Sequence, residues 1–301
     1  MILTIQISNP KMQNPFTNNT PLKKRLSINI PLTFLGILIL VSIQSKAQGD
    51  LLLYPKRIVF EGSKKSHTLN LANNGKDTVK YLVSVVQVKM KEDGGIENIS
   101  QPDSGQYFAD KNFRFFPRNV VLAPNEAQSI KIQLVNTNEL LPGEYRSHIY
   151  FRAEPDKKPL GEMESIQDTS SISVKIVAVF GISLPVIIRV GESTTKVSIA
   201  DPLLEWQNDS TASLKLAFIR TGNMSAYGDI SVDHISLQGK VTRIGVAKGM
   251  ALYAPNHKRN FNLLLDKNLG INYRSGKLHI VYTTQPDAKS VMMAQAELEF
   301  K

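Results

Sequence analysis

The stretch Ser129-Ile130-Lys131-Ile132-Gln133-Leu134 alternates strictly between polar and apolar residues. Successive side chains of a β-strand point to opposite faces, so this pattern predicts a strand with its three apolar residues on one buried face. The same alternation recurs at 147–152, 171–176, 213–218 and 277–282. Turn-forming groups such as Asn73-Asn74-Gly75 and Leu141-Pro142-Gly143 lie between such runs. The sequence therefore predicts an all-β protein built from antiparallel sandwiches.

Length and composition narrow the class of protein. The chain has 301 residues, of which 42% are apolar and 21% charged, and this size suggests two folded domains. It contains no cysteine, which excludes disulfides, thiolate metal sites and thiol nucleophiles. The net charge is +10, but residues 1–47 carry +5 of it, and acidic residues are interspersed with the remaining basic ones. This distribution predicts no nucleic-acid partner.

The first 47 residues have the three parts of a secretory signal peptide. Lys23-Lys24-Arg25 is a basic region, residues 30–43 are an apolar run, and Ser45-Lys46-Ala47 is a small-x-small cleavage site. We expect cleavage after Ala47 and export; the alternative is an uncleaved anchor. The rest divides after Val190, which predicts one immunoglobulin-like domain at 48–190 and another at 191–301.

Signatures of catalysis and of metal or cofactor binding are missing from the sequence. No two histidines have the spacing of a zinc site, and there is no nucleophile elbow or phosphate-binding loop. We therefore expect no enzyme activity, no metal and no cofactor. Two single residues also receive predictions: His148 should be solvated on the outward face of its strand, and Trp206 should lie in the core of the second domain.

Three segments carry a resemblance to a known family. They are the run 54–62, which contains Lys56-Arg57-Ile58; Phe116-Pro117-Arg118, followed by Leu122-Ala123-Pro124; and the run 141–146. Their order resembles the periplasmic pilus (fimbrial) assembly chaperones of chaperone–usher systems, the PapD-like proteins. The resemblance covers about 48–190 and continues more weakly through 191–301.

The resemblance implies a fold, a location and a mechanism. It implies two immunoglobulin-like domains arranged as a boomerang, in a periplasmic chaperone without catalysis. Such a chaperone binds pilus or fimbrial subunits by donor-strand complementation, which means that it lends an edge strand to a subunit lacking one. It then delivers the subunit to an outer-membrane usher, and without a client it can form a homodimer. The row Ile172, Val174, Ile176 and Ala178 would be the donor strand; alternatively, it is an ordinary core strand.

The resemblance also implies binding residues. Arg57 matches the family's cleft arginine, which would bind the client's terminal carboxylate; alternatively, it is a surface arginine. Ser183 stands where the family has a lysine, so the carboxylate would have one strong anchor, or a different second anchor such as Arg189. Glu144, Arg146 and Arg152 are candidates for an ion pair between the domains.

Two functions of other classes remain open on the sequence alone. A secreted or cell-surface immunoglobulin-like adhesion or binding protein would need no strand donation. An extracellular enzyme on a sandwich scaffold has no nucleophile, acid–base pair or metal cluster in its favour.

Overall fold

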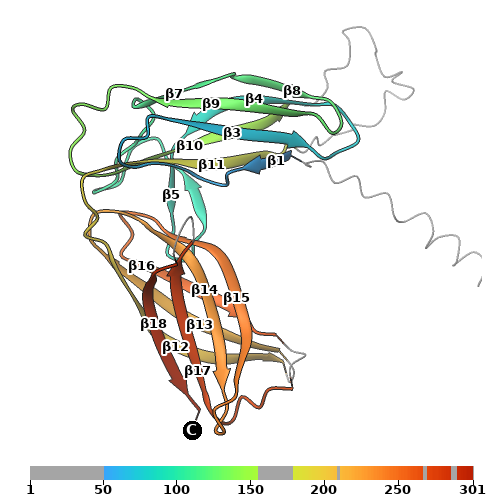
Figure 1. Ribbon diagram of the computed structural model, residues 1–301, viewed down its shortest axis with the longest axis vertical. Helices are drawn as coiled ribbons and strands as arrows, with labels where there is room; N and C mark the ends of the chain where they lie inside the picture. Colours follow the sequence, from blue (N-terminus) through green and yellow to red (C-terminus); the bar gives the residue numbers. More distant parts are fainter. Residues whose placement is uncertain (1–50, 155–178, 209–210, 267–269, 286–289, 301) are drawn as a thin grey trace, which may run out of the picture. The chain divides into compact units, whose positions relative to one another are not determined.

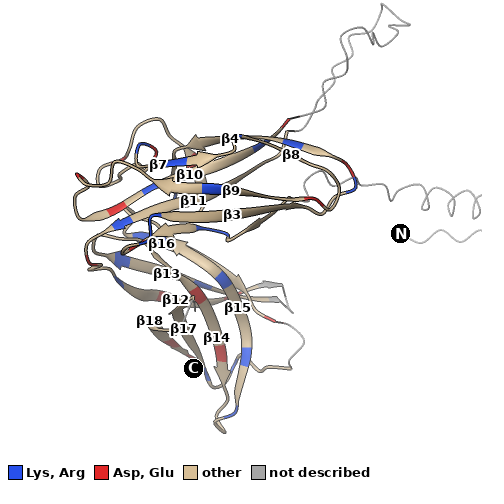
Figure 2. Cartoon of the chain, turned by 45° about the horizontal axis from the view of Figure 1, so that its top comes forward, with Lys and Arg blue, Asp and Glu red and all other residues tan. Residues whose placement is uncertain are grey.

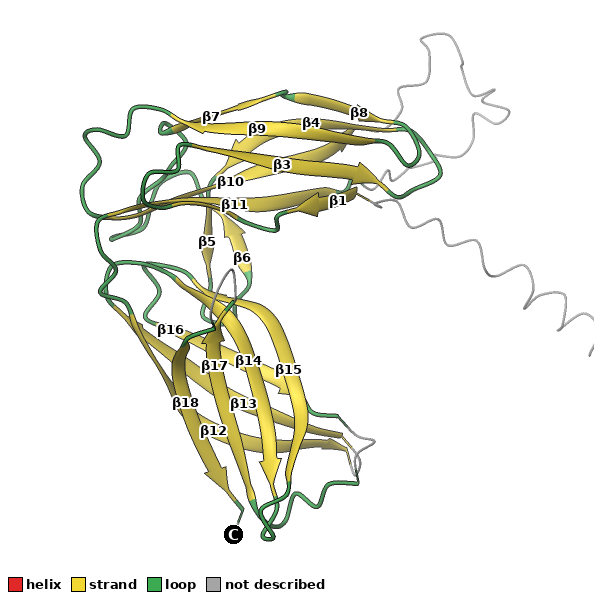
Figure 3. Ribbon diagram, viewed as in Figure 1, coloured by secondary structure: helices red, strands yellow, loops and turns green. Residues whose placement is uncertain are grey.

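The computed structural model describes residues 51–154, 179–208, 211–266, 270–285 and 290–300. All of them belong to one compact unit, Gln48–Lys301. The described residues form strands, turns and loops and contain no helix (Figure 3). Accordingly, no described segment is a helix long and apolar enough to cross a membrane. The predicted all-β class is confirmed.

Two sheets pack face to face to make the first sandwich (Figure 1). One sheet has the order β1 (Leu51–Tyr54), β3 (Ser66–Asn73), β9 (Ala127–Leu134) and β7 (Phe113–Phe116). The other has the order β2 (Ile58–Phe60), β11 (Gly181–Val190), β10 (Gly143–Glu154), β4 (Val79–Val86) and β8 (Asn119–Leu122). The predicted inward residues Ile130 and Ile132 are fully buried, opposite Ile149 and Phe151 of the second sheet. Alternation therefore identified the core correctly.

The chain changes sheets between β1 and β2. β1 pairs antiparallel with β3, whereas β2 pairs parallel with β11. Pro55 lies between them, and a proline cannot donate a ladder hydrogen bond, so pairing stops there. The crossing segment Pro55-Lys56-Arg57 then delivers Arg57 to the start of β2.

The second sandwich has its own core. One sheet has the order β12 (Lys196–Asn208), β13 (Thr211–Thr221) and β16 (Lys258–Leu264). The other has the order β15 (Val241–Leu252), β14 (Ala226–Ile235), β17 (Lys277–Thr284) and β18 (Met292–Glu299). Leu214, Phe218, Ile230 and Ile280 are fully buried between them. The predicted boundary after Val190 falls between β11 and β12, and it remains a prediction.

A small hairpin leaves the first sandwich and contacts the second. Its strands are β5 (Val88–Met90) and β6 (Ile96–Asn98), joined by a turn that contains Asp93-Gly94-Gly95. The Met90 carbonyl accepts a hydrogen bond from Asn256 Nδ2 at 2.7 Å, and the Glu92 carbonyl accepts one from Asn260 N–H at 2.6 Å. Hydrogen bonds from this hairpin therefore connect the two sandwiches, in addition to the covalent chain.

The prediction for Trp206 is wrong. Its side chain is 52% exposed, and its ring packs edge-on against Tyr273 at 5.8 Å between centroids. Trp206 pairs with Ala212 near the end of the β12–β13 ladder, next to a register shift, and thus lies at the margin of the second core. Lysine and arginine lie among aspartate and glutamate over both sandwiches (Figure 2), in line with the scattered charge seen in the sequence.

Candidate carboxylate-binding site

Arg57 is held against the second sandwich. Its guanidinium carbon lies 3.9 Å from the centroid of the Tyr227 ring, which belongs to β14. The Arg57 Nε–H is buried and has no hydrogen-bond partner in the described part of the chain. Burial lowers the pKa of Arg57, because loss of water disfavours the charged form. A buried donor left open is costly, so this arrangement favours a site that receives an acceptor.

Strand register extends the site into a charged face of the second sheet. Ile58 pairs with Val186, and Val186 pairs with Ser147. Side chains alternate along a strand, so the residues flanking these three lie together on the opposite face. One row of that face holds Arg57, Pro185 and His148, the next holds Val59, Ile187 and Arg146, and the third holds Glu61, Arg189 and Glu144. Ile187 is fully buried there against Ala251 and Tyr253, so the second sandwich covers this face.

Glu144 links the third row to the second sandwich. Its carboxylate accepts hydrogen bonds from the Ser225 N–H at 2.9 Å and from the Ser225 hydroxyl. It also lies 3.3 Å from Arg189 Nε, and Arg189 donates to the Ser225 carbonyl at 2.8 Å. Glu144 is 5% exposed, and charge-assisted hydrogen bonds are strong in such dry surroundings. Glu144, one of the candidates for an ion pair between the domains, therefore forms its ion pair with Arg189 of the adjacent strand β11. It reaches the second sandwich through hydrogen bonds from Ser225.

Arg146 makes a similar link in the second row. Its guanidinium carbon lies 4.1 Å from the Tyr253 ring centroid, and it donates to the Ala254 carbonyl at 3.1 Å. Its Nε–H is buried and has no partner among the described residues. The third ion-pair candidate, Arg152, is exposed: it lies further along β10, beyond the part of the strand that the second sandwich covers.

The prediction of a solvated His148 is wrong. The side chain is on the outward face of β10, as expected, but it is 4% exposed and its ring packs edge-on against Tyr253 at 6.3 Å. Burial, assisted by the charge of Arg146, lowers the pKa of His148 to about 3. The outward face of one sandwich is the buried face of the junction, which a single strand pattern does not reveal.

Positive charge exceeds negative charge at this junction. Arg57, Arg146 and Arg189 lie on the face of the first sandwich, and Arg220 of β13 is buried nearby. Among the described residues, the carboxylates that act on these arginines are Glu144, which is buried, and Glu61, whose side chain is 61% exposed. Uncompensated buried cations are unfavourable, so the junction is electrostatically suited to an added anion.

The proposed donor row Ile172, Val174, Ile176 and Ala178 lies outside the described residues. Its continuation is described: Phe180 is 50% exposed, Ile182 is partly buried and Leu184 is 2% exposed. These even-numbered residues continue the parity of the row. An apolar row therefore emerges from the core of the first sandwich toward Phe180.

The free edge of β11 runs beside this row. β11 pairs with β10 from Gly181 to Val190, but with β2 only at 186–188. The Ala153 N–H bonds to the Phe180 carbonyl, so even-numbered residues turn their backbone groups toward β10. Gly181 and Ser183 accordingly turn their N–H and C=O groups toward an edge that no described strand occupies. Pro185, which has no N–H, ends that edge beside Arg57.

Ser183 itself is exposed and supplies no charge. The strand register places Pro185, rather than Ser183, in the same row as Arg57. Arg189, the alternative second anchor, is already bound to Glu144 and Ser225. Arg57 is thus the junction arginine that the described residues leave most open.

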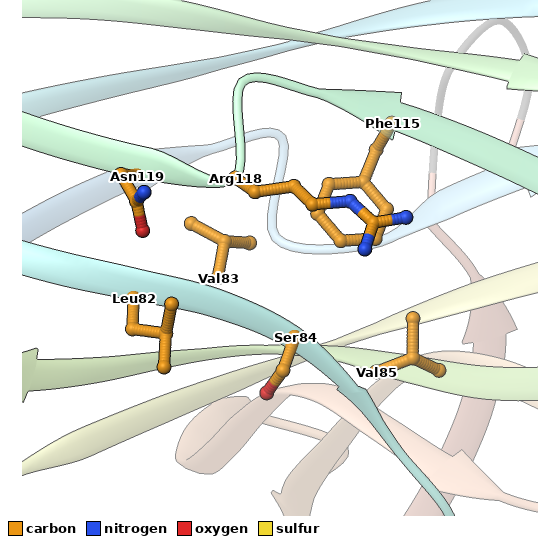
Figure 4. A pocket seen from close by; sticks show the side chains of 7 residues that line it. All are labelled: Leu82, Val83, Ser84, Val85, Phe115, Arg118 and Asn119. Carbon is orange, nitrogen blue, oxygen red and sulfur yellow. The ribbon is translucent and has the colours of Figure 1, made fainter.

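A second concave region lies on the side of the first sandwich. Figure 4 shows the Arg118 guanidinium over the Phe115 ring, 5.5 Å from its centroid, with Val83 and Val85 of β4 opposite. It forms where β8 stops pairing with β4 after Leu82 and the sandwich opens. It brings together a single cation and an apolar floor, and it lies apart from Arg57.

Sequence reasoning missed Tyr227, Tyr253 and Ser225. Tyr227 belongs to β14, Ser225 lies just before it and Tyr253 just after β15. All three are far along the chain from Arg57, and no local pattern marks them. Only the fold brings them to the same junction.

No protein-family model and no curated protein matches this chain. Solved structures do match most of its length. The Pseudomonas aeruginosa CupB2 chaperone is 12% identical, with a TM-score of 0.40, over 83% of this chain and 100% of that one. The class 5 fimbriae chaperone CfaA is 14% identical, with a TM-score of 0.38, over 83% and 99%.

A third match is a chain from the complex of the Salmonella enterica SafA pilin with the SafB chaperone. It is 14% identical, with a TM-score of 0.38, over 83% of this chain and 96% of that one. These structures come from the family that the sequence resembles. These identities are too low to transfer a function to this chain. Its function is therefore inferred from the contacts described above.

Proposed function

We propose that this chain is a periplasmic chaperone that binds fimbrial or pilus-type subunits by lending them a strand, and delivers them for assembly at the outer membrane. Residues 1–47 would be its signal peptide, 48–190 its strand-donating domain and 191–301 a second domain. It works by binding, without a catalytic step or a cofactor. The observation that carries this proposal is the free edge of β11, which ends at Arg57.

The direction of an added strand follows from β2. β2 runs parallel to β11 and begins at Ile58. A client strand added to the free edge in line with β2, and in the same direction, would end where β2 begins. Its C-terminal carboxylate would then meet Arg57. A strand added in the opposite direction would bring a terminal ammonium group or an uncharged backbone to the same arginine, which is unfavourable.

The chemistry of the junction supports a carboxylate at that end. Arginine offers a planar fork that matches a carboxylate, and the Arg57 Nε–H lacks a partner in the described chain. Such a bond is worth most where water is excluded. The excess of buried arginine over buried glutamate favours the same ligand.

The apolar row beside the edge supports strand donation rather than simple edge pairing. A strand that completes another protein's sheet must offer alternate apolar side chains as well as backbone groups. The row that leaves the core at Leu184 and reaches solvent at Phe180 has that parity. Exposed edges of this kind also promote self-association, so we expect a homodimer when no client is bound.

The test is capture of partners from envelope extract with the tagged protein, followed by mass spectrometry. Wild type is compared with Arg57→Ala, with Ile176→Asp in the proposed donor row, and with Arg243→Ala as a control at an exposed arginine. We expect small all-β subunits to co-purify with wild type and with Arg243→Ala, and to be lost from the other two variants.

Circular dichroism shows whether each variant is folded. If folded Arg57→Ala and Ile176→Asp proteins retain the same partners, strand donation at this edge is wrong. An immunoglobulin-like adhesion protein would then be the better description.

A further inference from the structure

We propose that the carboxylate site is shared between the two sandwiches, with Tyr227 of the second sandwich as the positioning residue for Arg57. The Tyr227 ring would hold the guanidinium by its face and leave its N–H edge free for the carboxylate. This inference rests on the proposed function and assigns to the second sandwich a part in client binding.

Arg57 has little else to hold it. It comes from the short segment that crosses between the sheets, and no described carboxylate forms an ion pair with it. Arg189, by contrast, is fixed by Glu144 and by the Ser225 carbonyl, and its N–H groups are engaged there. The 3.9 Å contact with the Tyr227 ring is therefore what fixes the direction of the Arg57 guanidinium.

The surroundings of Tyr227 fix its ring in a position where it can hold the Arg57 guanidinium. It is partly buried at the junction and pairs with Ala251, which is 6% exposed. Gly249 of β15 has a φ of 70°, and a Cβ added there would lie 2.9 Å from the Tyr227 hydroxyl. A side chain at position 249 would press on the tip of the Tyr227 ring, and the positive φ itself favours glycine there. The ring is thus positioned by both strands.

Stacking and carboxylate binding are compatible because they use different parts of the guanidinium. A cation–π contact uses the flat face of the group, whereas bidentate hydrogen bonds lie in its plane. An arginine fixed by its face loses less rotational freedom when the carboxylate arrives. Removing the stack should therefore weaken carboxylate binding by about 3-fold to 30-fold, the range expected for such contacts.

The experiment measures how well the protein distinguishes a carboxylate from an uncharged end. The probe is a fluorescent, N-acetylated hexapeptide of alternating threonine and valine, with either a free C-terminal carboxylate or a carboxamide. Fluorescence anisotropy gives the affinity ratio of the acid to the amide. It is measured for wild type, Arg57→Gln, Tyr227→Leu and Tyr227→Phe. Tyr273→Leu serves as a control, since it removes a partly buried tyrosine of the second core instead.

We expect Arg57→Gln to abolish the preference for the acid, Tyr227→Leu to reduce it by about 3-fold to 30-fold, and Tyr227→Phe and Tyr273→Leu to keep it. If Arg57→Gln abolishes the preference and folded Tyr227→Leu keeps it, the role of Tyr227 is wrong and the carboxylate site stands. If wild type shows no preference, or Arg57→Gln does not change it, the carboxylate site itself is wrong.

Discussion

At the scale of one residue, His148 makes the junction sensitive to pH. Its pKa is lowered from 6.5 to about 3, because the side chain is buried beside Arg146 and under Tyr253. Between these values the unfolded chain binds a proton that the folded chain does not. The contribution of His148 to the free energy of unfolding is therefore fully present above about pH 6.5 and is lost as the pH drops. The slope is about 1.4 kcal/mol per pH unit, which is about 2 to 3 kcal/mol down to about pH 4.5.

Urea denaturation across this pH range tests the prediction. We expect His148→Gln to show a flatter dependence than wild type, because glutamine does not titrate. His279→Gln, at a partly exposed histidine of β17, should keep the wild-type slope. Equal slopes for wild type and His148→Gln would mean that the folded protein protonates His148 or that other groups dominate.

For single residues, some properties could be predicted from the sequence and others could not. Arg57 was found through a resemblance around Lys56-Arg57-Ile58, and no alternation or spacing pointed to it. The face of His148 was predicted correctly and its solvation wrongly, because burial there comes from a different sandwich. Tyr227 could not be foreseen, since its role depends on which strand of the second sandwich meets the crossing segment.

At the scale of an element, the two sides of β11 should respond differently to proline. Ser183 turns its N–H toward the free edge, whereas Ile182 turns its N–H toward β10. Ser183→Pro should therefore keep the β10–β11 ladder and lower peptide or subunit binding at least about tenfold, because the ring blocks an added strand. Ile182→Pro should destabilise the fold by about 1 to 3 kcal/mol, because it removes a ladder hydrogen bond and leaves a carbonyl of β10 without its donor.

Thermal unfolding and peptide anisotropy separate these effects, and Ser183→Thr is the control that keeps the N–H. Unchanged binding by a folded Ser183→Pro protein would exclude strand addition at this point.

The strands themselves were the most predictable elements. Alternation located β9, β10, β13 and β17, because apolar side chains on one face of each alternate with polar or small ones on the other. The change of sheet between β1 and β2 was not predicted. It depends on Pro55, which interrupts pairing, and on the parallel register with β11, which only the folded structure reveals.

At the scale of the whole molecule, Glu144 should couple the unfolding of the two sandwiches. It is 5% exposed, belongs to the first sandwich and accepts two hydrogen bonds from Ser225 of the second. It is also the buried carboxylate nearest to Arg189. Glu144→Gln leaves that arginine with only the exposed Glu61 as a charged partner and weakens the bonds to Ser225. Breaking one side of a buried charged network costs about 2 to 4 kcal/mol.

Differential scanning calorimetry measures both stability and coupling. We expect wild type to unfold in one transition and Glu144→Gln to unfold at lower temperature, with the two sandwiches separating into distinct transitions. Glu297→Gln removes an exposed partner of Lys277 within the second sandwich and should change stability by less than about 1 kcal/mol. If Glu144→Gln matches that control and still unfolds in one step, the coupling must come instead from the β5–β6 hairpin, whose Met90 and Glu92 carbonyls bind Asn256 and Asn260.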